Sequence, residues 1–160
     1  MNYRIEILLR DQILQLYDDC SIVRSYLISS GKKGIGEEMG SEKTPRGAHR
    51  IRAKIGNGQE TNTVFVGRRP TGEIYTHEMK TAQPERDWIL TRIMWLCGME
   101  PGFNRFGNVD TMRRYIYIHG CPDEDLMGIP SSHGCIKMRN DEIIELFNQV
   151  SVGTPVLIKE

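Results

Sequence analysis

The sequence lacks a continuous apolar segment of the kind that directs a chain to a membrane. Charged side chains interrupt the amino-terminal stretch MNYRIEILLRDQILQLYDD at Arg4, Glu6, Arg10 and Asp11, whereas a signal peptide requires an unbroken apolar region. No later stretch approaches the roughly 20 apolar residues that span a bilayer. We therefore expect a cytoplasmic protein with no membrane span, or a periplasmic one if a leader has been removed.

The sequence also lacks net charge, because 21 basic residues balance 21 acidic ones. Without an excess of basic residues there is no overall field to favour nucleic acid, so we expect no nucleic-acid partner. The length of 160 residues and the hydrophobic content of 39% are typical of one soluble globular domain. We expect a single domain over residues 1–160.

Cysteine is scarce, with only Cys20, Cys97, Cys121 and Cys135. Two disulfides are arithmetically possible, but a chain of this size has no need of them and nothing in it indicates secretion. Reduced thiols are therefore expected. Cys20 and Cys97 have no histidine nearby in the sequence, and we interpret them as packing residues.

Short segments of alternating apolar and polar residues predict a mainly β fold. A meander is expected over residues 3–30, with a turn at Asp18-Asp19. A loop with five glycines follows over residues 30–47. Further strands are predicted over residues 48–56, 61–75 (with a turn at residues 69–73), 113–120 and 154–160.

Two segments have features of α-helices. Over residues 84–97, a proline opens the segment and Gly98 follows it. Apolar residues recur there at helical spacing, namely Trp88, Ile89, Ile93 and Leu96. Over residues 141–150, Asp141 and Glu142 would occupy the first turn, and Asn140 is expected to cap it. The fold class is therefore mainly β with two helices, at about 84–97 and 141–150.

The stretch IPSSHGCIKMRN places Ser132, His133 and Cys135 around one glycine, and His119 ends a predicted strand 16 residues before Cys135. A thiol of ordinary pKa is mostly protonated at neutral pH, so a cysteine nucleophile needs a base. His119 is the candidate base, and a carbonyl in the Gly120-Cys121 turn could orient its second ring nitrogen.

An oxyanion site is also expected beside the thiol. The backbone N–H groups of His133, Gly134 and Cys135 could point at one spot, and Gly134 would let the backbone come close. His133 could instead hold the loop or carry a proton. The basic residues Arg113, Arg114, Lys137 and Arg139 flank the proposed site, and we expect at least one of them to anchor a substrate carboxylate.

These motifs resemble those of the L,D-transpeptidase catalytic domain family, the YkuD-like family. The likeness rests on HG at residues 119–120, SHGCIKM at residues 132–138, VGTPVLI at residues 152–158 and KTPRGAHRI at residues 43–51. It implies a β-sandwich-like domain whose cysteine nucleophile acts on peptidoglycan stem peptides.

By position, the resemblance implies that Cys135 is the nucleophile and His119 the proton acceptor and donor. Ser132, His133 and Gly134 would line the acyl site. Gly120, Lys137 and Arg139 complete the expected oxyanion and substrate-binding residues. The chain departs from the family pattern at three positions. Lys137 stands where arginine is usual, which replaces a bidentate clamp by a point charge; Cys121 stands where threonine is common, and His49 where an aromatic is usual.

The resemblance implies acyl transfer that needs no cofactor. A chain in the cytoplasm would meet soluble stem peptides, so we expect an L,D-carboxypeptidase that releases D-alanine from tetrapeptides. An L,D-transpeptidase that forms cross-links is the alternative. The expected partners are a stem tetrapeptide or muropeptide, and carbapenem-type inhibitors that acylate Cys135.

An alternative of another class is a zinc-stabilised wall-binding module. His119, Cys121, His133 and Cys135 form a Cys₂His₂ set that could bind a structural zinc ion. Their spacing is unlike that of common zinc folds, so we prefer the catalytic interpretation, in which the site contains no metal.

Overall fold

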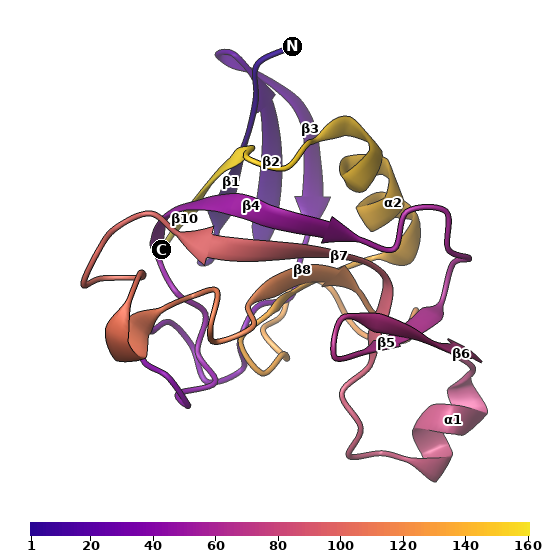
Figure 1. The fold of residues 1–160 in the computed structure, drawn as a ribbon. Helices are drawn as coiled ribbons and strands as arrows, with labels where there is room; N and C mark the ends of the chain where they lie inside the picture. Colours follow the sequence, from indigo (N-terminus) through magenta and orange to yellow (C-terminus); the bar gives the residue numbers. More distant parts are fainter.

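The computed structural model describes all 160 residues, and ten strands form one continuous sheet (Figure 1). The strands are β1 (Tyr3–Leu8), β2 (Ile13–Asp18), β3 (Ser21–Leu27), β4 (Gly47–Ile55), β5 (Thr63–Val66), β6 (Arg69–Ile74), β7 (Ile89–Gly98), β8 (Tyr117–Gly120), β9 (Ile136–Met138) and β10 (Pro155–Lys159). The main path runs in the order β3-β2-β1-β10-β4-β7-β5-β6, and β8 and β9 extend it from β7. The predicted mainly β fold is confirmed.

The sheet bends so that its two halves enclose the core. In Figure 1, β1, β2 and β3 run steeply across the direction of β4 and β7. A cluster of 20 buried apolar residues takes members from both halves, among them Leu14 of β2 and Leu96 of β7. Burial of this cluster is the main force that holds the halves together. The expected sandwich-like shape therefore comes from one bent sheet.

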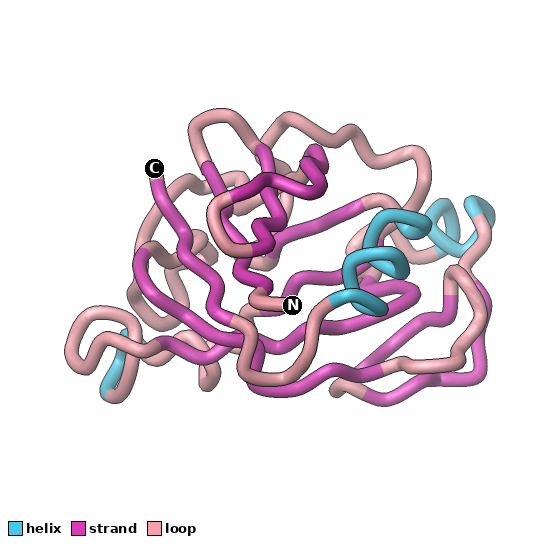
Figure 2. Tube along the Cα trace, turned by 90° about the horizontal axis from the view of Figure 1, so that it is seen from above, coloured by secondary structure: helices cyan, strands magenta, loops and turns pink.

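The two α-helices account for little of the chain (Figure 2). Helix α2 (Asn140–Gln149) confirms the prediction over residues 141–150, and its apolar side turns Ile143, Leu146 and Phe147 into the core. Helix α1 is a single exposed stretch, His77–Ala82. A 3₁₀ turn, η1, spans Gly107–Val109. Neither α-helix has the length and apolar character needed to span a bilayer.

The helix predicted over residues 84–97 is wrong, because β7 occupies most of that segment. Strand β7 lies inside the sheet, between β4 and β5 or β8, and side chains are buried on both of its faces. A strand buried on both faces has a continuous apolar run and no alternation. A register shift between Leu90 and Ile93, where Thr91 has a φ of 76°, also changes the phase of the pattern.

Two smaller predictions are also corrected. The turn expected at residues 69–73 lies earlier, at Gly67 and Arg68, whose positive φ angles of 56° and 63° join β5 to β6. Such a pair of positive φ angles is typical of a tight hairpin turn. Asn140 does not cap α2. It is buried in the first turn, and its side-chain amide donates to the Cys121 carbonyl at 2.9 Å.

Candidate active site

Cys135 lies immediately before β9, beside the strand that carries His119. Strands β8 and β9 are parallel, and His119 is paired with Lys137. Cys135 is therefore level with Tyr117, and two hydrogen bonds hold its sulfur there. The Tyr117 N–H donates to Sγ at 3.3 Å, and the thiol donates to the Tyr115 carbonyl at 3.3 Å.

His119 is buried on β8, and one of its ring nitrogens is already committed. Nδ1 lies 2.6 Å from the Gly120 carbonyl. Because a carbonyl can only accept, Nδ1 carries the proton in the neutral ring, and Nε2 is left as the acceptor. The predicted orientation of the imidazole by a carbonyl of the Gly120-Cys121 turn is confirmed. Gly120 is needed here, because a Cβ at this position would lie 2.7 Å from the Leu90 carbonyl oxygen.

Cys135 and His119 line the same cavity, of about 380 Å³. The other lining residues come from the β5–β6 turn, the start of β7, the chain before β8 and the loop before β9. They are Gly67, Arg68, Asp87, Ile89, Arg114, Tyr115, Ile116, Tyr117, Ser132 and His133. The structure thus brings a thiol and an imidazole with a free Nε2 to one opening.

Burial keeps both of these groups neutral at neutral pH. It raises the pKa of the Cys135 thiol to about 12, and the Tyr117 N–H and the Arg114 guanidinium only partly oppose this effect. Burial also lowers the pKa of His119, against the opposing attraction of Asp87. The resting pair is therefore a thiol and a neutral imidazole. A thiolate–imidazolium pair would require both pKa values to be shifted the other way.

The loop that carries Cys135 is held by Ser132, whose hydroxyl closes a turn. Ser132 Oγ donates to the Cys135 carbonyl at 2.5 Å and accepts from the Gly134 N–H at 3.1 Å. Gly134 has a φ of 122°, and a Cβ there would lie 3.1 Å from the Lys43 carbonyl oxygen. Glycine is the residue that tolerates both conditions.

Thr44 supports this loop from outside. Its hydroxyl donates to the Gly134 carbonyl at 2.9 Å and accepts from the Gly31 N–H at 2.8 Å. Thr44 is fully buried, so neither bond competes with water. This role of Thr44 was not predicted from the KTPRG motif, although a threonine near the end of a glycine-rich loop is a signal for it.

Two of the three N–H groups expected to bind an oxyanion are available. The Gly134 N–H is committed to Ser132, so that part of the prediction is wrong. The N–H groups of His133 and Cys135 make no hydrogen bond within the protein. Donors left unpaired beside a cavity are suited to bind developing negative charge.

The predicted basic anchors are dispersed. Lys137 pairs with Asp125 at 2.7 Å and lines a second cavity, and Arg139 is exposed and lines neither cavity. Arg113 lines a separate cavity described below. Arg114 does line the Cys135 cavity, but its guanidinium donates to the Lys43 carbonyl at 2.6 Å. Arg68 and Asp87 also line the Cys135 cavity and were not predicted as site residues, because Arg68 lies in a hairpin turn and Asp87 in the segment wrongly predicted as a helix.

The structure does not support the zinc alternative. Cys121 is buried and its thiol donates to the Met138 carbonyl at 3.3 Å. His133 is exposed, with Nδ1 3.9 Å from Asp87. No group of three or more histidine, cysteine, aspartate or glutamate residues is arranged to hold a metal ion. The four residues do not converge, since His119 and Cys135 face the cavity and Cys121 does not line it.

Comparison with known families identifies the class of protein to which this fold belongs. The chain belongs to the YkuD family of L,D-transpeptidase catalytic domains, whose model matches residues 2–158. It is similar to "Putative L,D-transpeptidase YqjB" from Bacillus subtilis (strain 168), with 44% identity over 59 residues, which are 37% of this chain and 32% of that protein.

Solved structures share the fold at low identity. The catalytic domain of an Enterococcus faecium L,D-transpeptidase acylated by ertapenem has a TM-score of 0.57 and 21% identity, over 99% of this chain and 97% of that one. L,D-transpeptidase 3 from Mycobacterium tuberculosis has a TM-score of 0.60 and 16% identity, over 99% of this chain and 61% of that one. The chain thus spans a third of the Bacillus relative and about three fifths of the longer mycobacterial protein.

Proposed function

We propose that the protein transfers the acyl group of a peptidoglycan stem peptide through a thioester on Cys135. The single observation that carries this proposal is that Cys135 and His119 line one cavity, with His119 Nε2 free to accept a proton. Membership of the L,D-transpeptidase family supports the choice of substrate.

The first half-reaction follows from these positions. Sγ of Cys135 attacks the carbonyl carbon of the third residue of a tetrapeptide while its proton moves to His119 Nε2. The carbonyl oxygen becomes an oxyanion within reach of the free N–H groups of His133 and Cys135. The C–N bond then breaks, His119 returns the proton to the leaving amine, and D-alanine departs from a thioester.

The second half-reaction depends on the acceptor. We propose that water is the basic acceptor, which makes the protein an L,D-carboxypeptidase that converts tetrapeptides to tripeptides. The half-buried position of Cys135 in an open cavity supports access of water to the thioester. His119 would deprotonate that water and then return the proton to the thiolate.

Cross-linking is a second candidate, because one observation favours it. A cavity of about 460 Å³ adjoins the Cys135 cavity, and the two share Asp87, Ser132 and His133. A second stem peptide in that cavity would present its amine to the thioester from the other side of His133. The reaction would then be transpeptidation.

Arg68 is the proposed anchor for a carboxylate of the peptide. It lines the Cys135 cavity and donates to the Tyr117 hydroxyl at 3.0 Å, and its guanidinium lies 4.8 Å from the ring centroids of both Trp95 and Tyr115. Stacking holds the planar group in place without using all of its donors. The remaining N–H groups are free for a carboxylate.

The same thiol is the proposed target of carbapenem-type inhibitors, whose ring carbonyl would form a thioester as the ring opens. The catalytic domain of the similar Enterococcus faecium L,D-transpeptidase is acylated by ertapenem. We also propose a cytoplasmic location, which the four free cysteines support because the cytosol keeps thiols reduced. Fractionation of cells that carry the tagged gene would test it.

One assay tests the function. The purified protein is incubated with a tetrapeptide muropeptide, and the products are identified by mass. Loss of one alanine indicates hydrolysis and a peptide dimer indicates cross-linking. Cys135→Ala should abolish either product, and Cys20→Ala, at an exposed thiol outside both cavities, should leave it unchanged. A Cys135→Ala variant that still forms product would overturn the proposal.

A further inference from the structure

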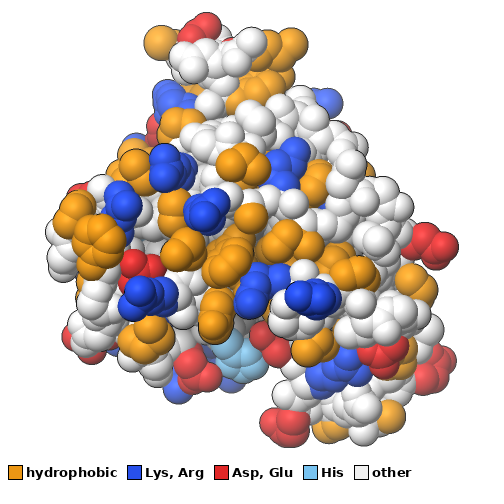
Figure 3. All heavy atoms as spheres, viewed as in Figure 1, with side chains coloured by type: hydrophobic (Ala, Val, Ile, Leu, Met, Phe, Trp, Pro, Cys, Tyr) orange, Lys and Arg blue, Asp and Glu red, His pale blue; other side chains and the backbone are white.

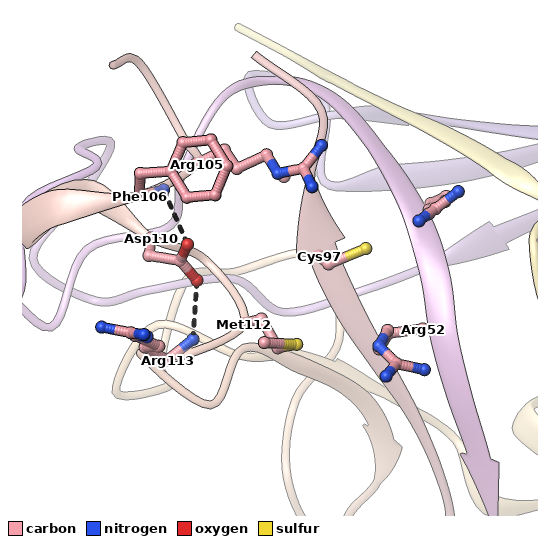
Figure 4. A pocket seen from close by; sticks show the side chains of 9 residues that line it. Arg52, Cys97, Arg105, Phe106, Asp110, Met112 and Arg113 are labelled. Carbon is pink, nitrogen blue, oxygen red and sulfur yellow. Dashed lines mark hydrogen bonds between the residues drawn. The ribbon is translucent and has the colours of Figure 1, made fainter. Parts of the chain in front are cut away.

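A cavity separate from the one at Cys135 is lined by arginines that have no acidic partner. Its volume is about 170 Å³, and it lies where β4 and β7 meet the loop that follows β7 (Figure 4). It shares no lining residue with the Cys135 cavity or with the cavity that adjoins it. Its lining residues are Arg50, Arg52, Cys97, Gly98, Arg105, Phe106, Asp110, Met112 and Arg113. None of these four arginines takes part in an ion pair of the protein.

The cluster is unusual for this chain, which has no net charge. Other arginines without an acidic partner, such as Arg10 and Arg69, lie outside the cavities, whereas this cavity has four such arginines in its lining. Figure 3 shows basic side chains grouped over the β4 and β7 face, toward the left of the view. Like charges brought together without counter-ions repel one another, and a bound anion removes that cost.

The one acidic residue of the cavity is already occupied. Asp110 is buried, and its carboxylate accepts the backbone N–H groups of Phe106 at 2.6 Å and Arg113 at 3.0 Å (Figure 4). Its role is to fix the loop. It makes no ion pair with any guanidinium of the cavity, so the positive charge around the opening stays largely uncompensated.

The loop that carries Arg105 and Arg113 is held rigidly against β4. The amide of buried Asn104 donates to the Ala48 carbonyl at 3.0 Å, and His49 Nε2 is bonded to the Thr111 hydroxyl at 2.9 Å. Arg50 and Arg52 project from β4 on the side away from the core, because Ile51 between them is buried. A rigid frame loses little entropy when it binds a ligand.

We propose that this cavity, the arginine cavity, binds a phosphate or diphosphate group. Guanidinium groups match the oxygens of such groups with paired N–H donors. A volume of about 170 Å³ suits a small anion, since a water molecule occupies roughly 30 Å³ of liquid, and it is too small for a stem peptide. A multiply charged anion balances several guanidiniums better than a single carboxylate does, although Arg113 points away from Arg52 and Arg105 in Figure 4. The site does not depend on the function proposed for Cys135.

Binding of inorganic pyrophosphate, measured by titration calorimetry at 0.15 M salt, tests the proposal. The wild-type protein should bind it saturably at one site. Arg50→Gln/Arg52→Gln should weaken the affinity by at least about tenfold, because two charged donors are lost. The matched control is Arg10→Gln/Arg69→Gln, which removes the same charge from exposed arginines outside the cavity and should bind as the wild type does.

The same variants separate a soluble ligand from a lipid headgroup. Vesicles of phosphatidylglycerol should bind the wild type more than Arg50→Gln/Arg52→Gln if a lipid supplies the phosphate, and equally if the ligand is soluble. Arg105→Gln/Arg113→Gln should repeat the loss of pyrophosphate binding if the first variant is unstable. No saturable pyrophosphate binding, or equal losses in the cavity and control variants, would overturn the proposal.

Discussion

The thiol of Cys135 lies in surroundings that disfavour its ionised form, although a nucleophile must lose its proton to react. Burial outweighs both the Tyr117 N–H and the Arg114 guanidinium in setting its pKa at about 12. His119 is also held neutral by burial, with its proton on Nδ1. In the proposed reaction the proton therefore moves during attack on the substrate and not before it.

Alkylation of the free protein should reveal this state. At pH 7.5 we expect iodoacetamide to modify exposed Cys20 at least about tenfold faster than Cys135, because the thiolate is the reactive form and a thiol with a pKa of about 12 is almost entirely protonated. Peptide mass spectrometry over a time course gives both rates. Preferential early labelling of Cys135 would contradict the neutral resting pair.

The pH dependence of kcat/KM should follow His119. Because burial lowers its pKa below the usual 6.5, the neutral imidazole persists at pH 6.5, and the rate should stay flat from there to pH 8. It should fall about tenfold per pH unit only at lower pH. The release of D-alanine from a tetrapeptide supplies the measurement, and an acid limb with its midpoint above pH 7 would show that the imidazole is not buried as described.

Among the elements, the loop from Ser132 to Cys135 depends on a second loop that is distant in sequence. Thr44 joins the two, because its hydroxyl bonds both the Gly134 carbonyl and the Gly31 N–H. The family-like motif around Thr44 and the one around Cys135 are therefore two sides of one contact. Gly134 adopts a φ of 122° without steric strain, and the bond from Thr44 to its carbonyl holds it there.

Replacing Thr44 by valine should test that support. The shape is kept, but two buried hydrogen bonds are lost, and we expect a loss of about 2–4 kcal/mol in the free energy of unfolding together with a fall in kcat larger than the change in KM. Urea denaturation and tetrapeptide kinetics measure the two effects. Thr61→Val is the matched control, at an exposed position outside the site. A Thr44→Val variant with normal kcat would show that the loop from Ser132 to Cys135 keeps its conformation without the Thr44 hydroxyl.

The sequence correctly predicted those elements in which one face is buried in the core, because their apolar residues recur at the spacing of that element. Strands β1 and β2 of the meander and helix α2 each have one face in the core, so their periodicity is visible. Strand β7 has no polar face, and its bulge at Thr91 gave Ile89, Ile93 and Leu96 an apparent helical spacing. Asn140 likewise looked like a cap because its partners across the fold cannot be read from its neighbours in sequence.

At the site, the local part could be predicted and the long-range part could not. The Cys135 loop and the orientation of His119 by the Gly120 carbonyl follow from residues close in sequence. The contributions of Arg68 and Asp87 require the hairpin and the strand that carry them to be placed correctly. The neutral resting state depends on burial, which no motif encodes.

At the scale of the whole molecule, protonation of His49 makes the free energy of unfolding depend on pH. Burial lowers its pKa to about 4, whereas an exposed histidine has about 6.5. The unfolded state therefore binds a proton more readily, so stability is full above pH 6.5 and falls as the pH drops through that value toward 4. At pH 5 the loss from this residue is about 2 kcal/mol.

Denaturation by urea at pH 7.5 and pH 5 measures this loss. His49→Gln should be less stable at pH 7.5, since the bond to Thr111 is disturbed, but it should lose about 2 kcal/mol less than the wild type on acidification. Carboxylates of ordinary pKa contribute little above pH 5, which isolates the histidines. Equal pH sensitivity in the two proteins would rule out His49 as the source.

The position of β10 has a consequence for how the chain is made. This strand is the last in sequence, yet it lies between β1 and β4 and pairs with both. While the ribosome is still adding Pro155–Lys159, strands β1 to β3 and strands β4 to β7 have no strand between them to join the two parts of the sheet. The sheet that carries Cys135 is thus completed only after β10 has been made, when it pairs with β1 across about 150 residues of the chain, and such long-range pairing is expected to make folding slow.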